Sequence, residues 1–253
     1  MSSIVTISDL HLTRSHKKAL KAWKSFLNSD VLKSADTIIF LGDIFDLMVG
    51  GKIQYLKQYD FFFVALLNLI KQGKRVIYLE GNHDFHLEKV FAHFQKENNL
   101  NGFQIKYYKD EFILNLGQKK ILFCHGDIID SKNESFKKWK NVYRSKYFKL
   151  FVNFLLPHFI IDLIGARASR NSKKRSSKYF NYDEFKDLYR EGAVSLFEER
   201  DCNVIVAGHT HIIDDYHCGD KQYINNGFPA RDMSCISISD QSVELISLTD
   251  SLV

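Results

Sequence analysis

The sequence predicts an α/β fold in which helices pack on a sheet, followed by short strands that build a second sheet. Five short apolar runs rich in β-branched residues recur along the chain, and each ends in a polar cluster. Stretches with helical periodicity separate the first three runs, which is the pattern of an α/β sheet covered by helices. With 253 residues, 45% of them hydrophobic, the chain can form one large domain (1–253) with an insertion, which we favour over two domains.

The first three strands are expected at "SIVTISDLH", "TIIFLGDIFD" and "RVIYLEGNHD". Apolar runs of this length that end in Gly, Asp or His are typical of buried strands. The stretches Ala19–Leu27 and Leu56–Ile70 have helical periodicity, so a β-α-β-α-β unit is expected. Functional groups then follow the carboxyl ends of the strands, where open α/β sheets bind their ligands.

The fourth and fifth strands are expected at "KILFCHGD" and "NVIVAGHTH", and the pattern changes after Asn203. The runs "YHCG", "QYINNG", "MSCISIS" and "SVELISL" are separated by Gly, Asp and Asn, and they predict an antiparallel continuation of a second sheet. The region from about 130 to 192 lies between the fourth and fifth strands. We therefore interpret residues 130–192 as an insertion that forms a helical lid beside the strand ends.

The insertion contains a long apolar run that predicts one broad helical face. Its residues recur at three- and four-residue steps from Phe148 onward: Phe151, Val152, Leu155, Phe159, Ile160, Leu163 and Ile164. A membrane span needs about 20 mostly apolar residues, and four polar or helix-breaking residues interrupt this run: Asn153, Pro157, His158 and Asp162. Two interpretations stay open. The face is buried against the core, or a helical pair around Pro157 presents it to acyl chains or a membrane surface, with flanking cations at headgroup level: Lys146, Lys149, Arg167 and Arg170.

Charge is concentrated in the same region. From Lys132 to Arg190 there are ten Lys and five Arg against five acidic residues, whereas the whole chain has a net charge of +5. Such asymmetry indicates a segment that faces an anionic partner. Nucleic acid is one candidate, but the basic residues adjoin a long apolar run, and few aromatic residues interleave with the tract "RNSKKRSSK". We expect no nucleic-acid partner, and the tract is suited to a diphosphate.

Cysteine usage and the N-terminus indicate a reducing compartment. The four cysteines are far apart and form no CxxC pair, so neither a disulfide framework nor a thiolate zinc site is expected. A strand-like run begins almost at once and lacks the basic and apolar regions of a secretory signal. We therefore expect a cytoplasmic protein.

Potential metal ligands follow all five expected strands. The set contains carboxylates, an amide and imidazoles: Asp9, His11, Asp43, Asn82, His125, His209 and His211. Oxygen and nitrogen ligands without cysteine are compatible with manganese, iron or zinc, and of these we expect manganese. One ion rarely takes seven such ligands, so we expect two divalent ions roughly 3.5–4 Å apart that share a bridging carboxylate. A glycine is adjacent to a ligand in four places, as backbone crowding around ions would favour: Gly42, Gly81, Gly126 and Gly208.

The blocks "SDLH", "GDIFD", "GNHD", "HGD" and "GHTH" resemble, in this order, the five signature blocks of the calcineurin-like metallophosphoesterases, and they span residues 8 to 211. The resemblance implies a two-sheet sandwich flanked by helices, and a two-metal hydrolase of phosphate esters or anhydrides. It also implies two ligand sets that share Asp43 as the bridge. The first ion would be bound by Asp9, His11, Asp43 and His211, and the second by Asp43, Asn82, His125 and His209.

The resemblance assigns catalytic roles beside the ions. Two such ions activate water, orient the phosphoryl group and neutralise its developing charge. His83 is expected to donate to the phosphoryl group or to protonate the leaving oxygen, and Asp84 to orient the His83 imidazole. Asp46 is expected to support the loop. Five other histidines are expected to be surface or packing residues: His16, His86, His93, His158 and His217.

The insertion, with its "NSK...SSK" tract, is similar to the lid of the bacterial UDP-2,3-diacylglucosamine diphosphatases. This resemblance implies cleavage of an anionic nucleotide-lipid to UMP and 2,3-diacylglucosamine 1-phosphate in lipid A biosynthesis, peripheral to the inner membrane. It implies substrate contacts by Asn82, His83, Asn133, Ser172, Arg175, Lys178 and His209. The best-known branch of that family has Arg where this chain has His83, so another nucleotide or lipid-linked diphosphate, or a phosphodiester, stays an alternative substrate.

Overall fold

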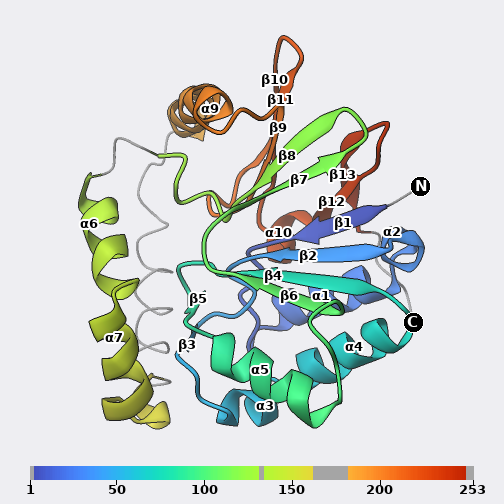
Figure 1. Cartoon of the computed structure of the whole chain (residues 1–253). Coiled ribbons are helices and arrows are strands. Elements are labelled where there is room, and N and C mark those ends of the chain that lie inside the picture. Colours follow the sequence, from blue (N-terminus) through green and yellow to red (C-terminus); the bar gives the residue numbers. More distant parts are fainter. Residues whose placement is uncertain (1–2, 131–133, 162–181, 249–253) are drawn as a thin grey trace.

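Two β-sheets face one another at the centre of the molecule, and helices cover their outer faces (Figure 1). The computed structural model describes residues 3–130, 134–161 and 182–248. Within these residues, one sheet has six strands in the order β13-β12-β1-β2-β4-β6. The other has five strands in the order β10-β11-β9-β8-β7, and β3 and β5 form a small separate ribbon. The predicted two-sheet α/β sandwich is confirmed.

The five strands predicted from apolar runs are present. They are β1 (Ile4–Ile7), β2 (Thr37–Leu41), β4 (Arg75–Leu79), β8 (Lys119–Phe123) and β9 (Val204–Ala207). β1, β2 and β4 run parallel to one another, and every residue of β1 and β2 is buried. One face of this sheet packs on the second sheet and the other on helices, which explains apolar residues on both faces.

Four helices cover the outer face of the first sheet: α1 (Lys17–Asn28), α3 (Gln54–Gln58), α4 (Asp60–Lys71) and α5 (Glu88–Glu97), which lie together below the sheet in Figure 1. The two predicted helical stretches correspond to α1 and to α3 with α4, whereas α5 was not predicted. The helix expected over Leu56–Ile70 is divided at Tyr59, whose φ and ψ are −113° and 35°. Tyr59 is buried, and its hydroxyl donates to the carbonyl of Leu47. Tertiary packing of this side chain therefore interrupts the helix.

The four short strands after Asn203 do not all join the second sheet as predicted. β10 (Ile213–Cys218) and β11 (Lys221–Asn226) do, but β11 pairs with β9 in parallel. β12 (Ser234–Ile238) and β13 (Val243–Ser247) return to the first sheet, where β12 pairs with β1. The helix α10 (Pro229–Asp232) carries the chain across, because Pro229 starts it and Met233 ends it with a φ of 48°. The prediction of one antiparallel continuation was wrong for β12 and β13.

Four further strands and a small helix complete the described core: β6 (Ile105–Tyr108), β7 (Phe112–Leu116), β5 (Asp84–Phe85) with its partner β3 (Met48–Val49), and α2 (Asp30–Ser34). On the second sheet, α9 (Tyr182–Glu199) packs through Tyr189, Ala193, Leu196 and Phe197. This helix continues across residue 192, where we expected the insertion to end. The C-terminal boundary of the predicted insertion therefore falls inside a helix that packs on the core.

The described part of the insertion forms helices at one side of the sheets, next to β3 and β5 (Figure 1). These are α6 (Glu134–Tyr143), α7 (Lys146–Leu150) and the π-helical turn η1 (Phe151–Leu155). The chain is extended at Leu156, as the residue before a proline requires, and residues 158–161 are helical again. Among the described residues, no helix combines the length and the apolar character that crossing a membrane requires.

The apolar residues of the insertion do not share one face, contrary to the prediction. Val152 and Ile161 are buried together with Val49, Phe85 and Tyr143. Other apolar side chains of the same segment are exposed: Trp139, Val142, Tyr147, Leu150, Phe151, Phe154, Leu155 and Phe159. Leu163 and Ile164, with the flanking Arg167 and Arg170, lie outside the described residues. The segment therefore has an inner apolar side against the core and an outer one toward solvent.

Candidate metal centre

The seven predicted ligands gather at the carboxyl ends of strands from both sheets. Asp9 and His11 follow β1, Asp43 follows β2 and Asn82 follows β4, whereas the other three follow β8 and β9 of the second sheet. Five of the seven have left-handed backbone conformations, with φ between 47° and 73°: Asp9, His11, Asp43, His209 and His211. Such conformations are costly for residues with a Cβ and cluster at functional sites.

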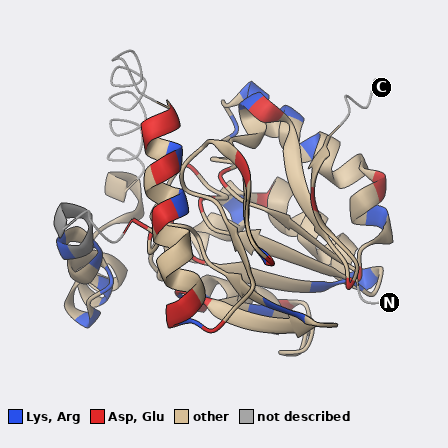
Figure 2. Cartoon of the chain, turned by 90° about the horizontal axis from the view of Figure 1, so that it is seen from above, with Lys and Arg blue, Asp and Glu red and all other residues tan. Residues whose placement is uncertain are grey.

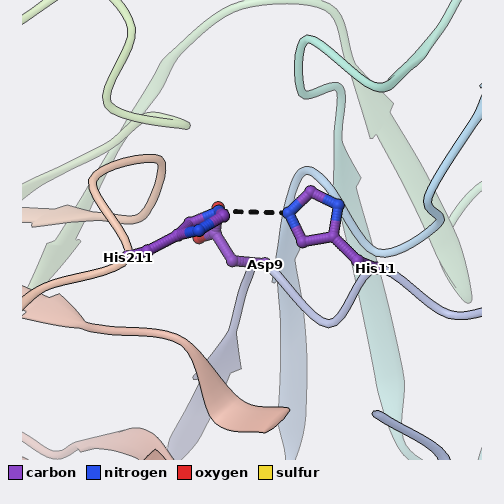
Figure 3. A group of neighbouring side chains, drawn as sticks. All are labelled: Asp9, His11 and His211. Atoms are coloured by element: carbon purple, nitrogen blue, oxygen red, sulfur yellow. Dashed lines mark hydrogen bonds and ion pairs between the residues drawn. The ribbon is translucent and has the colours of Figure 1, made fainter. Parts of the chain in front are cut away.

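One group consists of Asp9, His11 and His211, whose side chains point toward one another (Figure 3). Nε2 of His11 lies 3.1 Å from Nε2 of His211, which in turn lies 3.3 Å from Oδ1 of Asp9. The other carboxylate oxygen of Asp9 accepts hydrogen bonds from the Ser8 hydroxyl and from the backbone N–H of His209. Oδ1 of Asp9 is therefore held facing the two imidazoles.

A second group consists of Asn82, His125 and His209. Oδ1 of Asn82 lies 2.9 Å from Nε2 of His125 and 2.9 Å from Nδ1 of His209, and these nitrogens are 3.2 Å apart. Nδ1 of His125 donates to the carbonyl of Leu41, which directs Nε2 into the group. Three potential ligand atoms thus converge at one point.

Asp43 lies between the two groups. Its Oδ2 is 3.8 Å from Nε2 of His11, and its Oδ1 is 3.5 Å from Nε2 of His125. The side chain is buried, with 2% of the residue exposed. One oxygen thus faces each group, which is the position that the bridging role would need.

Close backbone approach explains two of the glycines in the centre. A Cβ on Gly81 would collide with the carboxylate and the backbone nitrogen of Asp43. A Cβ on Gly208 would collide with the side chains of Ser8 and Asp9. Glycine is required at these positions because the ligand-bearing loops touch there.

Residues 2–212 match the family model described as calcineurin-like phosphoesterase. The chain belongs to this family. A UDP-2,3-diacylglucosamine hydrolase of Psychromonas ingrahamii is 27% identical over 205 residues, which cover 81% of this chain and 79% of the relative. One of Photorhabdus laumondii is 28% identical over 247 residues, 95% of this chain and 97% of the relative. A solved structure of an archaeal phosphodiesterase is 14% identical with a TM-score of 0.48, over 96% of this chain and 98% of that chain.

The predicted family and enzyme class are thereby confirmed, and this phosphoesterase is a metal-dependent hydrolase. The chemistry of the gathered side chains fits divalent cations. Burial lowers the pKa of His11 to about 3 and that of His209 to about 4, so both rings are neutral and can bind a metal. Burial opposes ionisation of Asp9 and Asp43, but nearby histidines hold the pKa of each carboxyl below its usual value.

His125 shows that the centre favours positive charge. Burial lowers the pKa of His125, but the Asp43 carboxylate beside it outweighs that effect and raises the pKa to about 10. A cation that binds Nε2 of His125 would replace this proton and satisfy the same carboxylate. The imidazoles of His11 and His209, the ionised carboxylates and the amide oxygen at these separations therefore fit the predicted ions, and His125 fits them once a cation replaces its proton.

His83 faces the centre, but Asp84 does not orient it. Nδ1 of His83 donates to the carbonyl of Asp46 over 2.7 Å, and Nε2 lies 4.0 Å from Oδ2 of Asp43. The buried Asp84 carboxylate instead accepts hydrogen bonds from the Tyr78 hydroxyl and from four backbone N–H groups, those of Asp43, Ile44, Phe45 and Gly81. The predicted role of Asp84 is corrected accordingly, because both of its oxygens hold the backbone of the ligand loops.

Sequence reasoning missed a cavity of about 420 Å³ beside His211. His16, Phe228 and Arg231 line it, and the Phe228 ring stacks on His211 with centroids 4.9 Å apart. Arg231 donates to the carbonyl of His211 over 2.6 Å. Neither Phe228 nor Arg231 belongs to a motif block, so only the fold of the chain around α10 brings them to the centre.

Four predicted substrate contacts, Asn133, Ser172, Arg175 and Lys178, lie outside the described residues. The contacts predicted for Asn82, His83 and His209 are in the centre, as described above.

Proposed function

We propose that this phosphoesterase hydrolyses the diphosphate of UDP-2,3-diacylglucosamine to UMP and 2,3-diacylglucosamine 1-phosphate, a step of lipid A biosynthesis. The observation that carries the proposal is an exposed apolar and basic helical segment next to a candidate two-metal centre. The names of the two relatives described above support the same substrate. The enzyme would act in the cytoplasm, at the inner leaflet of the membrane.

Asp9, His11, Asp43 and His211 would hold one ion, and Asp43, Asn82, His125 and His209 the other. We expect manganese, with iron or zinc as alternatives, because the donors are oxygen and nitrogen atoms. The bound ions would supply Lewis acidity, an activated water and charge neutralisation at the phosphoryl oxygens. The Asp84 carboxylate keeps the Asp43 loop in place through the backbone bonds described above.

His83 would serve as the proton donor. Burial lowers its pKa, but Asp43 and the Asp46 carbonyl outweigh this and raise the pKa above its usual value. Because Nδ1 is engaged by Asp46, the proton for transfer is on Nε2, which faces the centre. In the reaction, water loses one proton to solvent and adds to one phosphorus, and the bond from that phosphorus to the bridging oxygen breaks. Nε2 of His83 gives its proton to the departing phosphate and is reprotonated from solvent.

The outer side of the insertion would receive the acyl chains or contact the leaflet. Phe154, Leu155 and Phe159 expose 70%, 72% and 69% of their surfaces, which is unusual for such large apolar residues. Positions of Lys and Arg gather on α6 and α7, at the left in Figure 2, and the Lys89 ammonium lies 5.0 Å from the centre of the Phe154 ring. Apolar side chains with adjacent cations suit an anionic lipid surface.

The remaining predicted contacts belong to the same proposal. Asn82 and His209 would contact the phosphates, and Asn133, Ser172, Arg175 and Lys178 the headgroup. Hydrolysis of another nucleotide or lipid-linked diphosphate is the second candidate function. The observation that favours it is His83, which stands where the best-known branch of these diphosphatases has Arg.

A substrate panel with manganese tests the proposal. It would compare UDP-2,3-diacylglucosamine, UDP-sugars without acyl chains, cyclic nucleotides and single-stranded DNA, with products identified by mass spectrometry. We expect the highest kcat/KM for the acylated substrate, with UMP and 2,3-diacylglucosamine 1-phosphate as products. Preferred hydrolysis of a UDP-sugar without acyl chains or of a cyclic nucleotide would refute the lipid substrate.

A further inference from the structure

The loop that carries Asn82 and His83 is closed at its base by Glu80 and His86. The backbone N–H of His86 donates to Oε1 of Glu80 over 2.6 Å, and both residues are buried. The loop runs from Glu80 to His86, and it contains the predicted ligand Asn82 and the proposed proton donor His83. The position of its base therefore controls the position of His83.

The insertion supplies partners to both residues of this base. The Arg144 guanidinium pairs with Oε2 of Glu80, and the carbonyl of Tyr143 accepts a hydrogen bond from Nε2 of His86 over 2.7 Å. Glu80 is fully buried, so Arg144 provides the countercharge that a buried carboxylate needs. The other carboxylate oxygen of Glu80 accepts from the Tyr107 hydroxyl of the core.

A second set of contacts fixes the insertion to the end of β3. Oδ1 of Asn153 accepts from the backbone N–H of Gly51 over 2.6 Å, and the Lys52 ammonium donates to the carbonyl of Asn153 over 2.8 Å. Val152 is buried and lies so close to Gly50 that a Cβ there would be 2.7 Å from Cγ1 of Val152. The inner side of the insertion therefore packs closely on this turn.

The β3–β5 ribbon joins the contact surface of the insertion to His83. Gly50 donates to the carbonyl of Phe85 at one end of the ribbon, and Met48 donates to the carbonyl of His83 at the other. Nδ1 of His83 donates to the carbonyl of Asp46, which is separated from the start of β3 by one residue, Leu47. A ribbon of two residues per strand thus connects Gly50 to His83 through backbone hydrogen bonds.

We propose that residues 143–153 of the insertion position His83 for catalysis on every substrate, acylated or not, with Arg144 and Asn153 as the positioning residues. This rests on the phosphoester hydrolysis and on the role of His83 proposed above, but it is independent of the lipid substrate. The inner side of the insertion would set the turnover number, whereas the outer side would contribute lipid affinity.

The test replaces Asn153 and follows hydrolysis of bis(4-nitrophenyl) phosphate with manganese, a substrate without acyl chains. We expect Asn153→Ala to lower kcat about 10-fold or more, with KM and manganese content unchanged, because small misplacements of a catalytic group are costly. Asn153→Asp keeps an acceptor for the Gly51 N–H and should retain most of the activity. Asn141→Ala, on the exposed part of α6, is the matched control and should leave kcat unchanged.

A double variant separates positioning from loss of structure. If Asn153 acts through His83, then Asn153→Ala should cause no further loss of kcat in the His83→Ala background. Additive losses, or a wild-type kcat for Asn153→Ala, would overturn the proposal. Arg144→Lys keeps the charge beside Glu80 but loses the guanidinium geometry, and a comparable fall in kcat is expected.

The outcome is distinguishable from that of the proposed function. If the wild-type enzyme hydrolyses the diester but not UDP-2,3-diacylglucosamine, the lipid substrate is refuted. The Asn153 and Arg144 variants would then still test the positioning of His83 on the diester. Wild-type protein that turns over only acylated substrates would contradict a positioning role on every substrate.

Discussion

For individual side chains of the metal centre, the sequence predicts which residues are ligand candidates but not which groups they contact. All seven ligand candidates could be selected from their motif blocks, because Asp, Asn and His at the ends of buried strands have few structural reasons to be there. The hydrogen-bond partners of the residues in these blocks could not be predicted from the sequence. Asp84 stands in a block beside His83, yet its carboxylate binds five groups of the core, and only the folded backbone of the Asp43 loop shows this.

Replacement of His83 tests its catalytic role. His83→Ala should lower kcat by about 10²- to 10⁴-fold, the usual contribution of general acid catalysis, with manganese content unchanged. Steady-state kinetics and metal analysis check this. His93→Ala is the control, since His93 pairs with Glu97 on α5 away from the centre, and it should have wild-type kinetics. Equal loss of activity in both variants would argue against a specific role for His83.

Gly81 tests the crowding of the ligand loops. Gly81→Ala should weaken manganese binding and cost about 1–3 kcal/mol of stability, because the added Cβ overlaps the Asp43 carboxylate. Urea unfolding and isothermal titration with manganese measure both effects. Gly102→Ala serves as the control, since nothing lies within 4 Å of its Cβ position. Normal manganese affinity in Gly81→Ala would contradict the crowding of this loop.

Among the helices and strands, the insertion is the element for which the periodicity of apolar residues gave a wrong prediction. Three- and four-residue spacing predicted one apolar face, but the π-helical turn Phe151–Leu155 changes the angular step between residues, and Pro157 ends the helix. The break at Pro157 was expected from the sequence, but the π-helical turn is not visible in a pattern that assumes 3.6 residues per turn. The result is a segment whose Val152 faces the core while Phe154 and Leu155 face solvent. Core packing, the first interpretation of the apolar run, therefore holds for Val152, whereas contact of the exposed residues with acyl chains or a membrane surface stays a prediction.

The exposed side of the insertion gives the element-scale prediction. The double variant Phe154→Ser, Leu155→Ser should raise KM for UDP-2,3-diacylglucosamine and reduce sedimentation with anionic phospholipid vesicles. Its free energy of unfolding should change by less than about 0.5 kcal/mol per residue, as for other exposed positions. Phe103→Ser is a matched control, because Phe103 is 81% exposed in a loop of the core. Unchanged vesicle binding and KM in the double variant would contradict lipid contact by this surface.

The strands with which β12 and β13 pair also could not be predicted from the sequence. β12 and β13 have the same short apolar character as β10 and β11, so local composition cannot say which sheet they extend. Their place is decided by α10 and by the antiparallel pairing of Ile238 with Ile4. Strand identity was predictable from local pattern, whereas pairing depended on tertiary structure.

For the whole molecule, the centre exists only when the two sheets are packed. Asp9, Asp43 and Asn82 come from the first sheet, and three histidines come from the second. Apolar residues such as Ile39, Phe123 and Val206 fill the space between the sheets and hold the two halves together. The order of the blocks along the chain implied this convergence through a family resemblance, and the structure shows its physical basis.

Ion binding should accordingly stabilise the whole fold. An ion that binds only the folded state adds about 2.7 kcal/mol at a concentration 100-fold above its Kd, so manganese should raise the Tm of chelator-treated protein. Differential scanning calorimetry with and without manganese measures this. Asp43→Asn should show little or no increase, and an equal increase in wild type and variant would place the stabilising ions elsewhere.

Manganese stoichiometry in wild-type protein and Asp43→Asn tests the central claim, a two-ion centre bridged by Asp43, most directly. Metal analysis after chelator treatment and reconstitution, together with hydrolysis of bis(4-nitrophenyl) phosphate, gives both readouts on the same samples. The account predicts two ions per chain in the wild type, and loss of ions and of hydrolysis in the variant. Two retained ions and wild-type hydrolysis in Asp43→Asn would contradict it.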